Sequence, residues 1–94
     1  HEHQITSLGA FFPHLTTEGI YVIEDIQIPG ISEKRHGYNN VDTLKLLTNF
    51  KQTGKFKSQF LSEDESEYLA KYISSVDLHF NQEFNYVIGV LTKK

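Results

Sequence analysis

The sequence contains no cysteine and no methionine among its 94 residues. Without cysteine the chain cannot form a disulfide, a zinc-thiolate site or a thiol nucleophile, and a short chain without crosslinks is typical of a reducing compartment. We therefore expect a cytoplasmic protein. Because a translated chain begins with methionine unless it is processed, the missing methionine also predicts that these residues are part of a longer polypeptide.

Long apolar runs and an excess of basic charge are missing as well. The longest apolar stretch, residues 86–91, is far shorter than the roughly 18 residues that a membrane span needs. The opening residues His1-Glu2-His3 do not resemble a secretory signal. Nine basic and twelve acidic side chains give a net charge of -3, whereas a nucleic-acid-binding domain is expected to be basic. The composition therefore predicts neither a membrane nor a nucleic acid as partner.

Apolar residues at helical spacing predict three helices. The first covers residues 4–15 and is expected to kink or end early at Pro13, which lacks a backbone donor. The second covers residues 41–50. The third begins at a capping box formed by Ser62 and Glu65 and runs to about residue 73.

Three apolar segments predict strands. Residues 20–23 are β-branched or aromatic throughout, which is typical of a strand covered on both faces in a parallel sheet. Residues 76–80 and 84–91 predict a terminal antiparallel hairpin whose last strand is inserted into the sheet and is also covered on both faces. The order of elements indicates an α/β fold, with a parallel strand flanked by helices, in a single domain or part of one.

Two adjacent carboxylates, Glu24 and Asp25, follow the first predicted strand directly. At the carboxyl end of a central strand they would border the ligand cleft of a doubly wound fold, where their repulsion favours a bound cation. Carboxylate oxygens suit Mg²⁺ or Mn²⁺ better than zinc. Residues 27–40 then form a long irregular loop of the kind that often carries function.

The first 25 residues resemble the second half of a class I S-adenosylmethionine-dependent methyltransferase, in the metal-dependent branch that methylates macrolide sugars (the mycinamicin and macrocin O-methyltransferases). The resemblance is carried by Glu2-His3-Gln4-Ile5-Thr6-Ser7-Leu8, Phe11-Phe12-Pro13-His14-Leu15 and Glu18-Gly19-Ile20-Tyr21-Val22-Ile23-Glu24-Asp25. Over residues 40–94 the resemblance is confined to the predicted order of helices and strands. It implies the carboxyl-terminal part of a Rossmann-like fold, without the cofactor-binding half.

The resemblance implies roles for particular residues. Glu24 and Asp25 match the pair that coordinates magnesium in that family. The third carboxylate and the general base belong to an Asp-Gly-Ser-His motif that would lie just ahead of His1, and the glycine-rich S-adenosylmethionine loop would lie further upstream. The resemblance therefore implies no catalytic base in this chain, which alone is expected to be inert and to bind the cofactor weakly or not at all.

The implied reaction is methyl transfer from S-adenosylmethionine to the hydroxyl of a sugar or a similar small molecule. Gln27 and His36 lie in the loop that would cover this acceptor. Relatives carry an aromatic-rich Thr-Ser-Tyr-Trp stretch and a glycine pair where this chain has Ile28-Pro29-Gly30-Ile31, so the acceptor stays open. Some relatives in that family are named hydroxylases and share this sequence pattern. One alternative is therefore an enzyme that acts on a different acceptor.

A second alternative is a non-catalytic α/β domain that serves as a subunit or assembly surface. It would associate through its sheet edge, for example to form a homo-oligomer.

The remaining motifs favour structural interpretations. His3, His14 and His79 are expected at the surface or in structural positions. The basic cluster of Lys51, Lys55 and Lys57 is interleaved with phenylalanines, as in some single-strand binders, but the overall charge favours a solvated connector.

Overall fold

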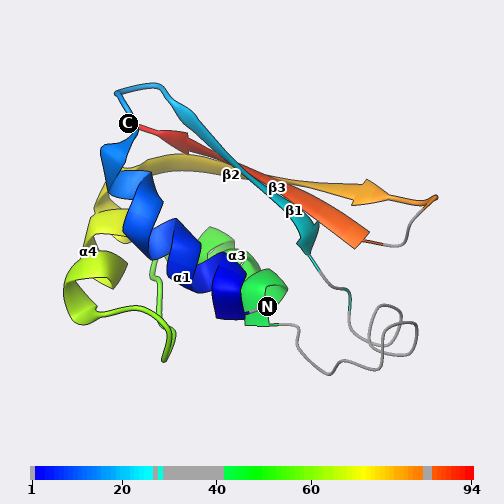
Figure 1. The fold of residues 1–94 in the computed structure, drawn as a ribbon, viewed down its shortest axis with the longest axis horizontal. Coiled ribbons are helices and arrows are strands. Elements are labelled where there is room, and N and C mark those ends of the chain that lie inside the picture. Colours follow the sequence, from blue (N-terminus) through cyan, green and yellow to red (C-terminus); the bar gives the residue numbers. More distant parts are fainter. Residues whose placement is uncertain (1, 27, 29–41, 84–85) are drawn as a thin grey trace.

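The computed structural model describes residues 2–26, 28, 42–83 and 86–94. These residues form a three-stranded sheet with helices on one of its sides (Figure 1). The helices are α1 (Glu2–Phe11), η1 (Phe12–His14, a 3-10 turn), α3 (Asp42–Thr53) and α4 (Glu63–Tyr72). The strands are β1 (Ile20–Ile26), β2 (Ile73–Asn81) and β3 (Tyr86–Lys93). The structure confirms that the fold mixes helices and strands. The parallel sheet predicted around the first strand is not found among the described residues, because both strand pairs there are antiparallel and β1 lies at the sheet edge.

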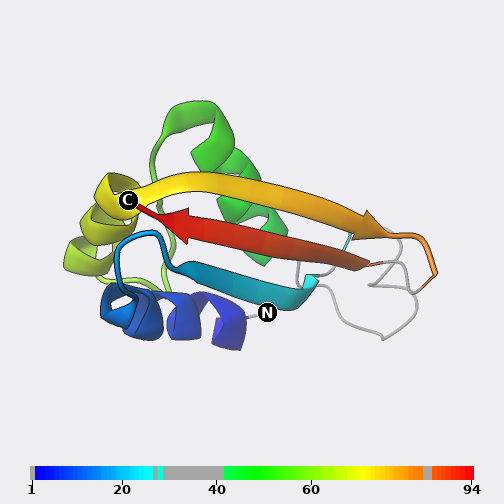
Figure 2. The same ribbon diagram turned by 90° about the horizontal axis from the view of Figure 1, so that it is seen from above.

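The strand order is β1-β3-β2, so the last strand of the chain lies between the other two (Figure 2). Both outer strands pair antiparallel with β3. The predicted hairpin and the insertion of its last strand are therefore confirmed. Since β1 and β2 are each antiparallel to β3, they run parallel to one another and their carboxyl ends lie at the same end of the sheet.

The prediction that the first and last strands are covered on both faces is wrong for the described residues. On β1, Ile20 is 58% exposed and Val22 47% exposed, whereas Ile23 is buried. Along β3, buried and half-buried residues alternate strictly. The reason is that α1, α3 and α4 all cover the same face of the sheet, which leaves the opposite face open (Figure 1).

The hydrophobic core lies between the sheet and these helices. Helix α1 contributes Ile5 and Leu8 at helical spacing, and Phe12 of η1 continues this stripe. The other core residues are Ile23, Ile26, Leu46, Leu47, Phe56, Leu61, Leu69, Ile73, Val76, Val87 and Leu91. Gly89 allows close packing at the centre of β3, because an added Cβ would lie 3.1 Å from Ile26 Cδ1 and 3.3 Å from Leu47 Cδ1.

The helix ends follow from local chemistry. Helix α1 stops at Phe11, and Pro13 lies in the 3-10 turn that follows, as predicted. At the start of α4 the Glu65 N–H donates to Ser62 Oγ (3.1 Å), and the Ser62 N–H donates to Glu65 Oε1 (2.8 Å). This capping box confirms the predicted start of α4.

Candidate functional site

The predicted metal pair, Glu24 and Asp25, lies in a bulge near the carboxyl end of β1. Ile23 pairs with Gly89 and Ile26 with Val87, so two residues of β1 stand opposite the single residue between those partners in β3. In a regular strand, Ile23 and Ile26 would face opposite sides because side chains alternate with a period of two. The bulge lets both be buried and leaves Glu24 and Asp25 exposed.

The backbone of Asp25 is in the left-handed region, with φ 56°. A residue with a Cβ adopts this conformation at a cost of roughly 1–2 kcal/mol, and aspartate tolerates it better than most residues. Bulges of this kind occur often next to active sites, where they redirect side chains. The pairing with β3 resumes after the bulge, where Ile26 stands opposite Val87.

The amino-terminal turn of α1 lies beside this bulge. Gln4 Nε2 donates to the backbone carbonyl of Glu24 at 2.6 Å. Helix α1 runs along β1, and its start lies near the end of β1 in both views of the ribbon (Figures 1 and 2). The hydrogen bond therefore joins the two elements at the position of the acidic pair and fixes the backbone of Glu24.

The chemistry of the donors fits a hard divalent cation, because both side chains offer carboxylate oxygens to solvent. Two carboxylates are fewer ligands than Mg²⁺ requires, since Mg²⁺ prefers six oxygen ligands and fills the rest with water or substrate. In the described part of the chain, no group of three His, Asp or Glu side chains comes together that could hold a metal. Glu24 and Asp25 are thus suited to supply part of a site.

The other residues that the sequence analysis singled out lie elsewhere on the surface or outside the described residues. Gln27 and His36 lie outside the described residues, as does His1. His3 is exposed on α1, His14 is exposed in η1, and His79 is exposed on β2. Of the predicted site residues, the structure therefore locates the acidic pair, at the end of β1.

A buried lysine forms a second polar cluster that the sequence did not predict. Lys93, the last residue of β3, is 8% exposed, and its Nζ donates to the carbonyls of Pro13 (3.1 Å) and Leu15 (2.7 Å). The same ammonium lies over three aromatic rings, 5.2 Å from the centroid of Tyr68, 5.9 Å from that of Phe12 and 6.0 Å from that of Tyr72. Neutral carbonyls and rings stabilise the charge, so the cluster joins β3 to η1 and α4.

Tyr21 of β1 packs at the edge of this cluster. Its ring centroid lies 6.4 Å from that of Phe12. Burial raises the pKa of Tyr21 above its ordinary value of 10.0, so its hydroxyl stays protonated at neutral pH. Tyr21 therefore acts as an uncharged packing residue at physiological pH.

Comparison of the chain with protein-family models, with curated proteins and with solved structures yields no match. The α-helices of the described ranges have ten to twelve residues, and no helix there could span a membrane.

Proposed function

We propose that these residues form the carboxyl-terminal half of an S-adenosylmethionine-dependent, metal-assisted O-methyltransferase that acts on a sugar or a similar hydroxyl. The observation that carries the proposal is the bulge in β1, which exposes Glu24 and Asp25 together at the carboxyl end of the strand. Ligands of α/β proteins bind at such strand ends.

The sheet supports the proposal in two further ways. Its strand order, with the last strand antiparallel between two strands that are parallel to each other, agrees with the closing hairpin that the resemblance implies. Its open face carries Ile20 and Val22, which are apolar and about half exposed. A doubly wound fold would cover this face with helices from its other half.

In the proposed reaction the methyl carbon moves from the sulfonium of the cofactor to the acceptor oxygen, and the hydroxyl proton goes to a base. Glu24 and Asp25 would hold Mg²⁺ or Mn²⁺, and Gln4 would keep the backbone of Glu24 in place through its hydrogen bond. When bound, such a metal lowers the pKa of the acceptor hydroxyl and stabilises the developing alkoxide. The base and the cofactor loop would come from the upstream half.

The test is methyl transfer by an enzyme that contains these residues, measured as S-adenosylhomocysteine release with a panel of sugar acceptors. We expect chelation with EDTA to abolish turnover and added Mg²⁺ to restore it. Glu24→Gln and Asp25→Asn should each lower kcat by about 100-fold or more, the effect typical of losing one electrostatic stabiliser. Circular dichroism should show an unchanged fold, because both side chains are exposed.

A matched control is available on α4, where Glu63 and Asp64 form another exposed Glu-Asp pair that lies in no bulge. Glu63→Gln combined with Asp64→Asn should leave turnover unchanged. Full activity in Glu24→Gln or Asp25→Asn would remove the metal assignment. The rival interpretation, a non-catalytic subunit that associates through β1, predicts no turnover with any acceptor or metal.

A further inference from the structure

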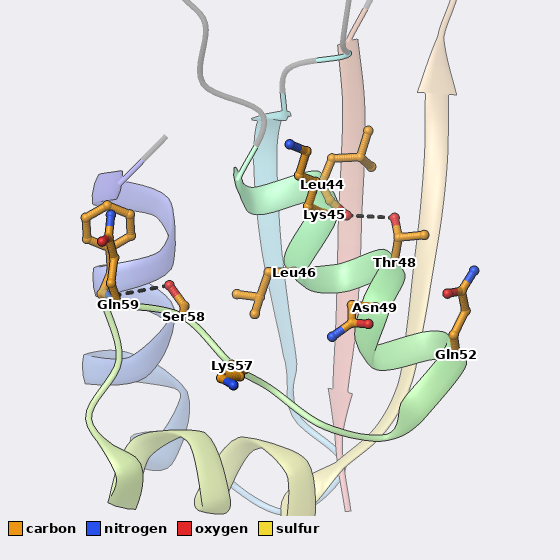
Figure 3. A pocket seen from close by; sticks show the side chains of 10 residues that line it. Leu44, Lys45, Leu46, Thr48, Asn49, Gln52, Lys57, Ser58 and Gln59 are labelled. Atoms are coloured by element: carbon orange, nitrogen blue, oxygen red, sulfur yellow. Dashed lines mark hydrogen bonds between the residues drawn. The ribbon is translucent and has the colours of Figure 1, made fainter.

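Strand β2 is one of the two outer strands of the sheet (Figures 2 and 3). Among the described residues it pairs with β3 alone, and this pairing is regular from Ser75 to Asn81. The N–H and C=O groups of an outer strand that point away from its sheet can pair with a further strand. The sheet can therefore be extended along this side of β2.

Proteins usually block such an edge with lysine, proline or a bulge. The other outer strand, β1, carries the bulge described above, and Gln4 donates to its Glu24 carbonyl. On β2 the irregularity in pairing lies at the start, between Ile73 and Ser75, and residues 75–81 contain neither lysine nor proline. Strand β2 is therefore the less protected of the two edges.

Two polar side chains of β2 point to the open face of the sheet. Asp77 and His79 both stand opposite half-buried residues of β3, whose side chains lie on that face, and both are exposed. Leu78 lies between them and points to the face that the helices cover, opposite Gly89. A carboxylate and an imidazole therefore lie on one face, on either side of Leu78.

A second copy of β2 that runs antiparallel along this edge matches these groups in one register. When Leu78 lies opposite Leu78 of the second copy, a twofold axis passes between them and each Asp77 lies opposite a His79. Directly opposed residues have Cβ atoms about 4.5–5.5 Å apart, so the imidazole can donate a hydrogen bond to the carboxylate. The same contact forms twice, because the two copies present the same surface to each other.

The neighbouring registers do not match. Registers that keep the helices of both copies on the same side of the sheet move the axis by one residue at a time. If the axis lies at Asp77, two carboxylates stand directly opposite each other, which destabilises a strand pair. If it lies at His79, two imidazoles are opposed and Asp77 lies opposite Asn81. The order of side chains in β2 therefore selects the register centred on Leu78.

The helix side of the edge favours the same register. It places Phe80, which is 53% exposed, opposite Val76 of the second copy, and aromatic and β-branched side chains stabilise each other across strands. Thr48 and Gln52, which extend from α3 toward β2, are exposed and neutral (Figure 3). They therefore place no charge beside the edge that would repel a second copy.

We propose that the chain forms a twofold-symmetric dimer through β2, in which the two three-stranded sheets join into one and His79 of each copy donates a hydrogen bond to Asp77 of the other. Each copy contributes a single strand to the contact, so the interface is small and the dimer is weak and reversible. The proposal does not depend on the methyltransferase assignment, because it uses no residue of β1.

The test is sedimentation equilibrium of the chain at concentrations from about 10 μM to about 1 mM, which covers the affinities expected of a small interface. We expect a reversible monomer–dimer equilibrium. Asp77→Lys should weaken it at least about tenfold, because both carboxylate acceptors of the dimer are lost and ammonium groups take their place. His79→Glu should weaken it by a similar factor, because it sets carboxylates opposite each other at both contacts.

The double variant, Asp77→Lys combined with His79→Glu, separates this pairing from a general effect of charge. It places each lysine opposite a glutamate and should restore the affinity to within about threefold of that of the original chain. Glu67→Lys, at an exposed position of α4, makes the same change in charge as Asp77→Lys and should leave dimerisation unchanged.

Circular dichroism should show an unchanged fold in every variant, since all three positions are exposed. A chain that is still monomeric at about 1 mM would overturn the proposal. So would an Asp77→Lys variant that dimerises as well as the original chain, or a double variant as weak as the single ones.

Discussion

Replacing Phe12 by alanine is expected to lower the free energy of unfolding by about 3–5 kcal/mol, the cost typical of deleting a buried aromatic ring. Phe12 is 0% exposed and lies where α1 passes into η1. Its ring faces Tyr21 of β1 and the ammonium of Lys93. Removing it leaves a cavity between η1, β1 and the end of β3.

The adjacent Phe11 is the matched control, because the same side chain is there 61% exposed. Phe11→Ala should change the free energy of unfolding by no more than about 0.5 kcal/mol, as expected for an exposed position. Urea denaturation followed by circular dichroism measures both variants. If Phe12→Ala unfolds the chain entirely, Phe12→Leu should still cost about 1 kcal/mol. Similar effects at both phenylalanines would contradict the burial of Phe12 in the core beside an exposed Phe11.

Replacing Lys93 by methionine is expected to lower the free energy of unfolding by about 2–4 kcal/mol. Hydrogen bonds to a charged group contribute roughly 1.5–3 kcal/mol each, and the two bonds to Pro13 and Leu15 share one ammonium, so their contributions do not simply add. Methionine keeps most of the apolar stem, so the loss reports the ammonium and not the packing. The carbonyls of Pro13 and Leu15 would lose their donor in a part-buried environment.

Lys94, the next residue, is exposed and gives the control. Lys94→Met removes the same charge and should leave stability nearly unchanged in the same denaturation experiment. A Lys93→Met variant as stable as Lys94→Met would show that the buried ammonium contributes nothing to joining β3, η1 and α4.

The helices were largely predictable because their signals are local. The capping box at Ser62 and Glu65 places the start of α4 correctly, and Pro13 ends α1 as expected. Helix α3 continues three residues beyond its predicted end at Phe50. Its last turn is polar and so carries no hydrophobic signal, and Gly54 is what ends it.

The burial of the strands was less predictable, because an apolar run indicates two covered faces only where the chain supplies both covers. Ile20 and Val22 match a buried strand in sequence, yet within the described residues they lie on the open face. The spacing of Ile23 and Ile26 around two carboxylates is a signal that could have revealed the bulge. A regular strand would have to bury one carboxylate or expose one isoleucine.

The lysine cluster could not be predicted from local sequence. Lys93 contacts Pro13 and Leu15, which are 80 and 78 residues away along the chain. Such contacts follow from tertiary packing, and Lys93 has no sequence motif of its own.

Metal binding by Glu24 and Asp25 in the β1 bulge can be measured by adding Mn²⁺ to the ¹⁵N-labelled chain and recording paramagnetic line broadening. We expect the amides of residues 23–26 to broaden at lower Mn²⁺ concentrations than those of residues 63–64, and Asp25→Asn to abolish this preference. Equal broadening at the two acidic pairs, or broadening at β1 that survives Asp25→Asn, would contradict this expectation.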